Sequence, residues 1–298
     1  MKWKRGSGRT QIEDRRGQAG GFGGFGSLGG SGGGGGFPLP RGGAGMGLGG
    51  LVLLGVILFA LFSTGALGGG GSSESPPGSA LSGAPDAQSE LADFVAFVVN
   101  DIQTWWQQDF RGDGRTYQVT KLVLFEGGTQ SGCGAASSDT GPFYCPVDRK
   151  VYLDLDFFRE LQSRFQAPGD FAQAYVIAHE FGHHVQTLLG TEQRVREEQQ
   201  RSPSEANELS VRMELQADCY AGAWANSAYE QGQLESGDLQ EGLAAASAVG
   251  DDRIQRGAGE RVNPETWTHG SSEQRVQWFQ IGFEDGEPGD CDTFSASI

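Results

Sequence analysis

Histidine is scarce in this sequence, and basic residues are scarce outside its glycine-rich beginning. The 298 residues include 4 His, 4 Cys and 22 Lys+Arg against 38 Asp+Glu. Residues 1–50 hold 7 basic and 2 acidic side chains. Residues 51–298 therefore hold 15 basic and 36 acidic side chains, a net charge of −21. A domain this acidic repels phosphate backbones, which excludes nucleic-acid binding through a basic face. A polypeptide or another neutral or cationic partner fits better.

The glycines lack the three-residue period of collagen. They come in irregular runs such as residues 32–36, and 29 of the 50 fall within residues 1–100. Residues 1–43 alternate basic residues with glycine-rich stretches and contain almost nothing to bury. Such a segment cannot offset the entropy of ordering, so we predict a disordered basic arm.

One long apolar run follows the arm. Residues 42–73 carry no charge, and residues 44–67 are long and apolar enough for a single transmembrane helix. Basic residues precede this run and acidic residues follow it, which predicts a cytoplasmic N-terminus. Residues 68–87 are typical of a Gly/Ser/Pro linker, and residues 88–298 are expected to form a domain outside the cytoplasmic membrane.

Strands are expected near the beginning of this domain. After a helical pattern in residues 90–110, β-branched and aromatic residues predict a strand over 117–127. In residues 150–156, KVYLDLD, apolar side chains alternate with polar ones, which predicts a strand with one buried face and one wet face. As an edge strand it could pair with an extended substrate peptide.

Helices are expected to dominate the rest. Asp170 is the predicted N-cap of a helix that ends at Gly190, and a capping box that starts at Ser202 begins a second helix that continues past Tyr220. Further helices are expected over residues 237–256 and 272–284. The fold class is therefore α+β, mostly helical with a small sheet.

The four cysteines predict two disulfides in an oxidising compartment. Three pairings are available. Cys133 with Cys145 is the local pair, which leaves Cys219 with Cys291. A zinc site made of cysteines is the alternative, but the sequence lacks the CxxC spacing that would support it.

The segment YVIAHEFGHHVQ, residues 175–186, contains the motif HExxH. On a helix, His179 and His183 share a face and can direct two imidazoles at one metal ion, with Glu180 beside them. At this composition the motif is expected by chance about 0.004 times per chain. Its apolar neighbours indicate a buried helix. His184 lies about 100° around the helix from His183 and is expected to be a packing residue.

A catalytic zinc site needs a third protein ligand and one open position. The metzincin pattern would place Gly and His where this chain has Gln186 and Leu189, which excludes that class. Residues 203–230 instead contain ELQAD, in which Glu214 and Asp218 lie four residues apart on one helix face. We predict Glu214 as the third ligand and Asp218 as the acceptor that orients a ligand histidine.

The chemistry expected of such a site is hydrolysis by a zinc-activated water, with Glu180 as general base. The oxyanion that forms needs a second donor besides the metal. His269 is our candidate, against the alternative of a structural histidine that bonds a loop carbonyl. Weaker candidates are Glu205 and Glu208 for the metal, and Tyr144 and Tyr175 for the oxyanion.

These motifs together resemble a family of bacterial neutral zinc metallopeptidases, which are membrane-anchored and gluzincin-like. The resemblance covers nearly the whole chain through MKWKRG, IEDRRG, GPFYCPVDRKVYLDL, AHEFGHHVQ, ELQADCYAGAWA and HGSSEQRVQWFQIG. It implies a zincin-like domain with one zinc ion held by His179, His183 and Glu214, and with Glu180 catalytic. It also implies the bacterial cytoplasmic membrane as the location.

The leading function is therefore a membrane-anchored zinc peptidase that acts on polypeptides. One alternative is a non-catalytic envelope scaffold with a structural zinc, and another is a zinc amidase that acts on cell-wall peptides. Glu180 argues against the scaffold, because a purely structural site has no use for a general base.

Overall fold

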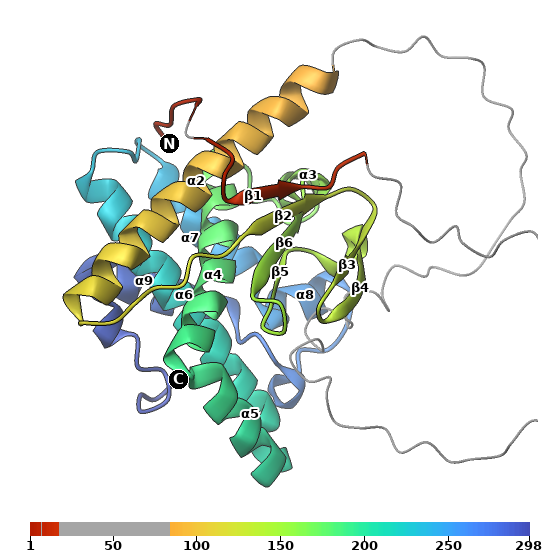
Figure 1. Ribbon diagram of the computed structural model, residues 1–298. Coiled ribbons are helices and arrows are strands. Elements are labelled where there is room, and N and C mark those ends of the chain that lie inside the picture. The colour runs from red at the N-terminus through yellow and green to blue at the C-terminus, as the bar shows by residue number, and fades with distance from the viewer. Residues whose placement is uncertain (7, 18–83) are drawn as a thin grey trace, which may run out of the picture.

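The computed structural model describes residues 1–6, 8–17 and 84–298 (Figure 1). The predicted transmembrane span, residues 44–67, lies outside this part of the chain, as does the predicted linker up to residue 83. Within the described part, no helix combines the length and the apolar character that a membrane crossing requires.

A four-stranded sheet with the order β1-β2-β6-β5 forms one side of the domain. β1 pairs with β2 and β2 with β6 in parallel, whereas β5 and β6 are antiparallel. A separate antiparallel ribbon is formed by β3 and β4. The strands are β1 (Ile12–Asp14), β2 (Leu122–Phe125), β3 (Gly128–Ser131), β4 (Gly134–Ser137), β5 (Phe143–Cys145) and β6 (Lys150–Asp154).

The strand at KVYLDLD exists as β6, but the prediction of an edge strand with one wet face is wrong. β6 lies between β2 and β5, and its residues 151–154 are at most 1% exposed on both faces. One face packs against the helices. The other belongs to a small apolar cluster of Val123, Phe125, Phe143, Cys145 and Tyr152, against which Cys133 and Ala136 pack. The edge strand on this side of the sheet is β5.

Helix α4 lies between the sheet and the other helices. It contacts β5 and β6 on one side and α6 and α7 on the other, and α9 packs along α6 (Figure 1). The helices are α2 (Ala84–Gly112), α3 (Asp156–Ser163), α4 (Asp170–Leu189), α5 (Thr191–Arg201), α6 (Ala206–Glu230), α7 (Asp238–Ala248), α8 (Asp251–Gly257) and α9 (Ser272–Asp285). This part of the chain is therefore mostly helical with small sheets, which agrees with the predicted α+β class.

Three helix predictions need correction. Asp170 is the first residue of α4 rather than its N-cap, which is Gly169. The capping box at Ser202 does not form. A 3-10 turn, Pro203–Glu205, leads into α6 instead. The single helix expected over 237–256 is broken into α7 and α8, because Gly250 has an extended backbone (φ −71°, ψ 140°). Only glycine fits there, since an added Cβ would lie 2.3 Å from the backbone nitrogen of Ser272.

Residues 1–6 and 8–17, which belong to the predicted disordered arm, are ordered. β1 adds to the sheet beside β2, with Ile12 opposite Leu122. Met1 is only 5% exposed, and its amino group donates a hydrogen bond to Asp170 at the start of α4, at 2.5 Å. The strand hydrogen bonds and the burial of Met1 offset the entropy that composition alone suggested could not be offset.

Two disulfides join the cysteines in the pairing that the sequence favours. Cys133–Cys145 links the β3–β4 ribbon to β5, and Cys219–Cys291 links α6 to the C-terminal tail.

Candidate metal centre

Helices α4 and α6 approach each other closely at the site because small residues face each other there. A Cβ added to Gly182 would lie 3.0 Å from the Cα of Ala217. Any larger side chain in α4 at this position would push α6 away. The contact therefore sets how near the side chains of α4 can come to those of α6.

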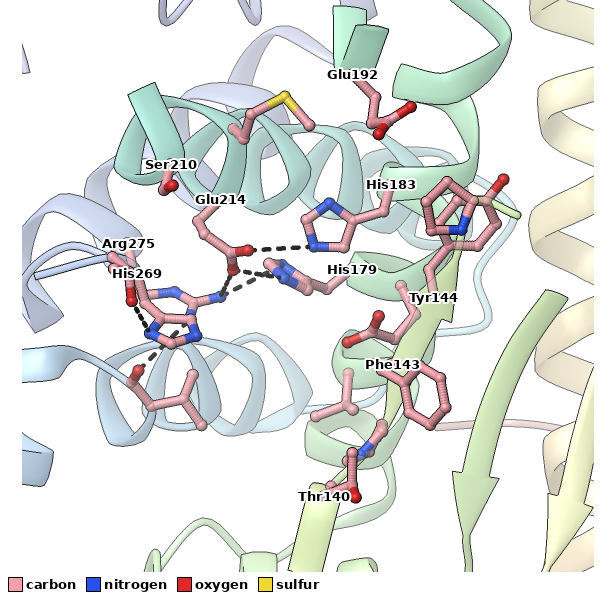
Figure 2. A pocket seen from close by; sticks show the side chains of 18 of the residues that line it. Thr140, Phe143, Tyr144, His179, His183, Glu192, Ser210, Glu214, His269 and Arg275 are labelled. Atoms are coloured by element: carbon pink, nitrogen blue, oxygen red, sulfur yellow. Dashed lines mark hydrogen bonds and ion pairs between the residues drawn. The ribbon is translucent and has the colours of Figure 1, made fainter. Parts of the chain in front are cut away.

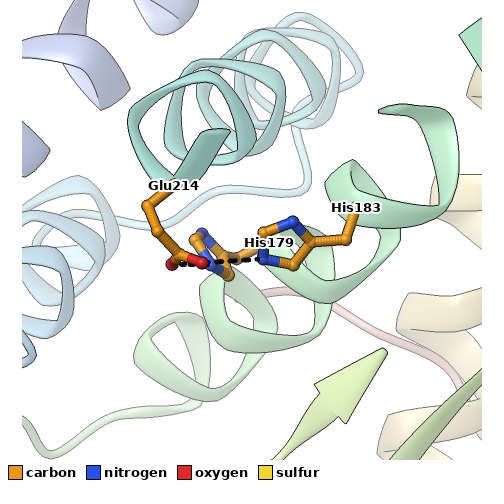
Figure 3. Close-up of side chains that lie close together, drawn as sticks. All are labelled: His179, His183 and Glu214. Atoms are coloured by element: carbon orange, nitrogen blue, oxygen red, sulfur yellow. Dashed lines mark hydrogen bonds and ion pairs between the residues drawn. The ribbon is translucent and has the colours of Figure 1, made fainter. Parts of the chain in front are cut away.

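His179 and His183 of α4 point at Glu214 of α6 (Figure 3). Nε2 of His179 lies 3.2 Å from Oε2 of Glu214, and Nε2 of His183 lies 3.5 Å from Oε1. The three donor atoms fall within 4.8 Å of one another. Two imidazole nitrogens and one carboxylate oxygen are a donor set that zinc prefers in proteins.

The second ring nitrogen of each histidine is held by a neighbour. Nδ1 of His179 donates to Oδ1 of Asp218 at 2.8 Å, and Nδ1 of His183 donates to Oε1 of Gln186 at 2.9 Å. Because both acceptors bond Nδ1, the neutral form of each imidazole has its lone pair on Nε2, the nitrogen that is turned toward Glu214. This is the arrangement expected of metal-ligating histidines, whose other nitrogen is held by a carboxylate or amide oxygen.

Asp218 is fully buried, and Arg275 of α9 neutralises its charge. Nε of Arg275 donates to Oδ2 of Asp218 at 2.8 Å, and Nη2 donates to Oδ1 at 2.9 Å. The hydroxyl of Tyr175 donates to the same Oδ1 at 2.5 Å. A buried carboxylate is costly without such partners, and this one has a bidentate cation as well as the histidine.

The electrostatics of the group suit a cation. Burial alone would raise the pKa of Glu214, but the charge of His183 and the hydrogen bond from His179 hold that pKa well below its usual range. Burial alone would lower the pKa of His179, but the charge and hydrogen bond of Asp218 and the hydrogen bond to Glu214 raise it to about 9. A metal ion that binds here therefore displaces a proton from His179.

Glu180 lines a largely apolar cavity of about 240 Å³, together with His179, His183 and Glu214. Only 8% of Glu180 is exposed, and this burial raises the pKa of its carboxyl despite the nearby histidines. Apolar side chains from β5, from several helices and from the loop after α3 line the cavity, among them Phe143, Phe157, Phe165, Val176, Val195 and Met213.

His269 also lines the cavity, on the side of Glu214 and Arg275 (Figure 2). Its Nδ1 donates to Oδ1 of Asp251 at 3.0 Å. The other oxygen of Asp251 accepts the backbone N–H groups of Thr268, His269 and Gly270 at 2.7–3.1 Å. This carboxylate therefore fixes both the loop and the imidazole, while no residue of the described part of the chain bonds Nε2 of His269.

The other candidates lie away from the metal-ligating atoms or are engaged elsewhere. His184 is buried, donates from Nε2 to the carbonyl of Gln118 at 2.7 Å and has its pKa lowered to about 4 by burial, as a packing histidine does. The hydroxyl of Tyr144 donates to Nδ1 of His184 at 3.1 Å, and that of Tyr175 is taken by Asp218. Glu205 and Glu208 are exposed at the start of α6.

Three site residues escaped the sequence reasoning: Gln186, Asp251 and Arg275. Gln186 sits one turn after His183, a spacing that could have marked it as a partner. A buried carboxylate such as that of Asp218 is stable only beside a positive charge, but the sequence does not indicate which basic residue supplies it. Asp251 and His269 are 18 residues apart with no periodic pattern between them.

Comparison of the sequence with known proteins identifies its family. Residues 1–294 match the family model described as "Putative neutral zinc metallopeptidase". The chain belongs to this family. Two similar proteins are "Uncharacterized protein YpfJ" of Escherichia coli K12, 46% identical over the full length of both chains, and "Uncharacterized protein Rv2575" of Mycobacterium tuberculosis H37Rv. The latter is 47% identical over 214 residues, which are 68% of this chain and 70% of that protein. No solved structure matches the chain.

A zinc peptidase family implies zinc, and the residues described above fit that ion. His179, His183 and Glu214 would hold it, with Asp218 and Gln186 orienting the imidazoles. A second acidic group, Asp170, Asp238 and Glu241, lies around the amino group of Met1, which already supplies a positive charge there.

Proposed function

We propose that this family member is a zinc-dependent peptidase that hydrolyses peptide bonds in polypeptides, with Glu180 as general base. The observation that carries the proposal is the convergence of His179, His183 and Glu214 beside Glu180 on one wall of a cavity. A structural zinc is enclosed by four protein ligands, whereas this group offers three and opens on the cavity. That difference supports an enzyme over a scaffold.

The buried carboxyl of Glu180 is suited to proton transfer. When bound, zinc supplies the Lewis acidity that makes a water molecule nucleophilic and polarises the substrate carbonyl. Glu180 accepts the proton of the attacking water and passes it to the leaving amine. Burial raises the pKa of Glu180, so its carboxylate is a stronger base than an exposed one.

His269 is proposed to donate a hydrogen bond to the oxyanion. Because Asp251 accepts from Nδ1, Nε2 carries a proton only when the imidazole is positively charged. Burial would lower the pKa of His269, but the hydrogen bond to Asp251 and the charges of Glu214 and Asp251 raise it. This shift favours the cationic form, which can donate to the oxyanion.

The substrate is proposed to be an extended peptide with an apolar side chain in the cavity. β5 has β6 as its neighbour on one side, and the cavity is lined by Phe143 and Tyr144 of β5. The outer edge of β5 can therefore pair with a peptide backbone, the role that we first expected of β6. Main-chain pairing of this kind supplies affinity with little demand on sequence.

The change Glu180→Gln tests this function in the full chain, because β1 belongs to the sheet. We expect the variant to bind zinc as the parent does, while kcat/KM on an unfolded protein substrate falls by roughly 10²–10⁴-fold. Zinc content is measured by elemental analysis and cleavage by mass spectrometry. Glu208→Gln is the control, since this exposed glutamate on α6 pairs with Arg212 instead.

Undiminished cleavage by Glu180→Gln would overturn the role of Glu180. A parent protein that binds zinc but cleaves no protein substrate would favour the scaffold. A second assay with cell-wall fragments separates the amidase, which would release peptides from the fragments and leave proteins intact.

A further inference from the structure

The described residues of the N-terminal segment (residues 1–17), which are 1–6 and 8–17, are built into the same folded unit as residues 84–298. β1 runs parallel to β2 in register from Ile12 with Leu122 to Asp14 with Leu124. Closer to the beginning, the backbone N–H of Lys2 donates to the carbonyl of Gln233 at 2.6 Å. The segment therefore contacts the domain at both of its ends.

Side chains anchor the segment between these two points. The ring of Trp3 meets Phe94 of α2 edge-on, with centroids 5.6 Å apart. Nη2 of Arg9 lies 2.7 Å from Asp93, and Nη1 of Arg16 donates to the carbonyl of Gln88 at 3.0 Å. The cations of residues 1–17 thus bind the acidic domain.

Acidic residues of the segment also bind the domain. Nζ of Lys150 on β6 lies 2.7 Å from Oε2 of Glu13. The other carboxylate oxygen of Glu13, Oε1, contacts Arg15. Arg15 reaches further, to the hydroxyl of Thr129 and the carbonyl of Gln130 on β3. Exposed ion pairs are individually weak, but here they flank a strand that is hydrogen-bonded into the sheet.

This docking constrains membrane topology. Gly17 and Ala84 bound the stretch of residues 18–83, and both belong to the folded unit. One transmembrane crossing within that stretch would put β1 and β2 on opposite faces of a bilayer and break the sheet. We propose that residues 1–17 and 84–298 lie on the same side of the membrane, so that no single crossing separates them.

The proposal replaces the orientation expected from charge. That expectation rested on seven basic residues before the apolar run, but the charge bias counts only within about 15–20 residues of a span. Six of the seven lie in residues 2–16, at least 28 residues before residue 44, and only Arg41 is close. Residues of the folded domain bind five of these six side chains, namely Lys2, Arg5, Arg9, Arg15 and Arg16, which are therefore not free flanking charges.

The shared side is expected to be the extracytoplasmic one. Disulfides persist in oxidising compartments, and the domain has two, Cys133–Cys145 and Cys219–Cys291. The N-terminal segment would then be exported together with the domain. This inference does not depend on the proposed peptidase activity.

Cysteine labelling of the full-length protein in intact cells tests the topology. Lys4→Cys reports on the N-terminal segment and Glu260→Cys on the domain, since both side chains are exposed. A membrane-impermeant maleimide is added before or after lysis, with the parent chain as background and a cytoplasmic protein as a lysis control. Thr10→Cys, also exposed, replaces Lys4→Cys if that variant does not accumulate.

We expect both positions to react before lysis. If one position reacts before lysis and the other only afterwards, the shared side is wrong. If both react only after lysis, the shared side holds and the extracytoplasmic location is wrong.

A charge-reversal cycle tests the docking itself in the purified full chain. Arg9→Glu and Asp93→Arg should each lower the melting temperature, and the double variant should recover part of the loss. Strictly additive losses would show that Arg9 does not contact Asp93 in solution and would overturn the docked arrangement. Arg115→Glu with Asp113→Arg, an exposed pair outside the segment with a separation of 3.9 Å, is the control.

Discussion

Asp251 controls what His269 can do, although it does not itself touch a reacting group in the proposed reaction. Its carboxylate accepts from Nδ1 of His269 and from three consecutive backbone N–H groups. The imidazole is therefore oriented by one residue, and its charge is stabilised by the same residue. Loss of the negative charge of Asp251 should therefore affect the protonation of His269 more than it affects the fold.

The change Asp251→Asn should move the alkaline limb of the pH profile of kcat/KM to lower pH. The protonated imidazole is the proposed oxyanion donor, so activity falls as pH rises through the pKa of His269. Asp251 raises that pKa, and an amide in its place would let it fall. The measurement is a pH profile of kcat/KM in both proteins.

Asp252→Asn is the matched control for this prediction. The neighbouring carboxylate bonds Ser272 and Arg256 instead of His269. An alkaline limb that stays in place in Asp251→Asn, while the overall rate drops, would contradict the donor role and leave Asp251 with a structural one.

Residues of the site differ in how far the sequence could predict them. The convergence of His179, His183 and Glu214 follows from helical spacing on two segments, and the orienting role of Asp218 from the same spacing. Arg275 lies 57 residues beyond Asp218 and reaches it only because α9 packs on α6. Such contacts arise from tertiary packing, which leaves no local pattern.

At the scale of elements, two glycines let α9 lie against α6 closely enough for Arg275 to reach the site. A Cβ on Gly282 of α9 would lie 1.9 Å from the carbonyl oxygen of Cys219, and one on Gly222 of α6 would lie 2.1 Å from that of Phe279. Both obstacles are backbone atoms, which cannot turn aside as a side chain could. The two helices can accommodate a methyl group only by moving apart.

Gly282→Ala should therefore destabilise the protein and weaken zinc binding. The gain in helix propensity is about 1 kcal/mol, but a core without room usually loses about 1–3 kcal/mol and here must shift backbone. We expect a net loss of about 2 kcal/mol in the free energy of unfolding, measured by urea denaturation. Because Arg275 is on the displaced helix, zinc affinity measured by chelator competition should fall too.

Gly257→Ala serves as the control, since nothing lies within 4 Å of a Cβ at this last residue of α8. Its stability should equal that of the parent or slightly exceed it. Equal stability of Gly282→Ala and Gly257→Ala would mean that α6 and α9 are not in the close contact described.

Helices and strands were predictable where the apolar periodicity is strong. The predictions failed where tertiary contacts determine the local structure. The helix that carries the motif and the helix that carries Glu214 both follow from the pattern of apolar residues, although the caps predicted for their N-termini were wrong. β1 could not be predicted, because a three-residue strand in a polar, glycine-rich sequence forms only where β2 offers an edge. The break between α7 and α8 likewise lies at Gly250, which approaches Ser272 closely.

At the scale of the whole molecule, the division of charge acquires a structural meaning. The basic beginning and the acidic remainder, which composition presents as separate regions, are joined through pairs such as Arg9 with Asp93. The two disulfides of this folded unit close chain loops of very different length. The cysteines are 12 residues apart in Cys133–Cys145 and 72 residues apart in Cys219–Cys291. Their contributions to stability should differ accordingly.

Removal of the long-range disulfide should cost more stability than removal of the local one. In the chain-entropy account, the closed loops correspond to about 4 kcal/mol for Cys219–Cys291 and about 3 kcal/mol for Cys133–Cys145. Paired Cys→Ala variants of each bond, compared by urea denaturation of the full chain, give the two losses. The long bond also joins α6 to the tail at the point where Gln216 donates to the carbonyl of Cys291, so its loss should lower zinc affinity as well. An equal or smaller loss for the Cys219–Cys291 variant would indicate that the tail stays ordered in the unfolded ensemble, or that native strain offsets the constraint.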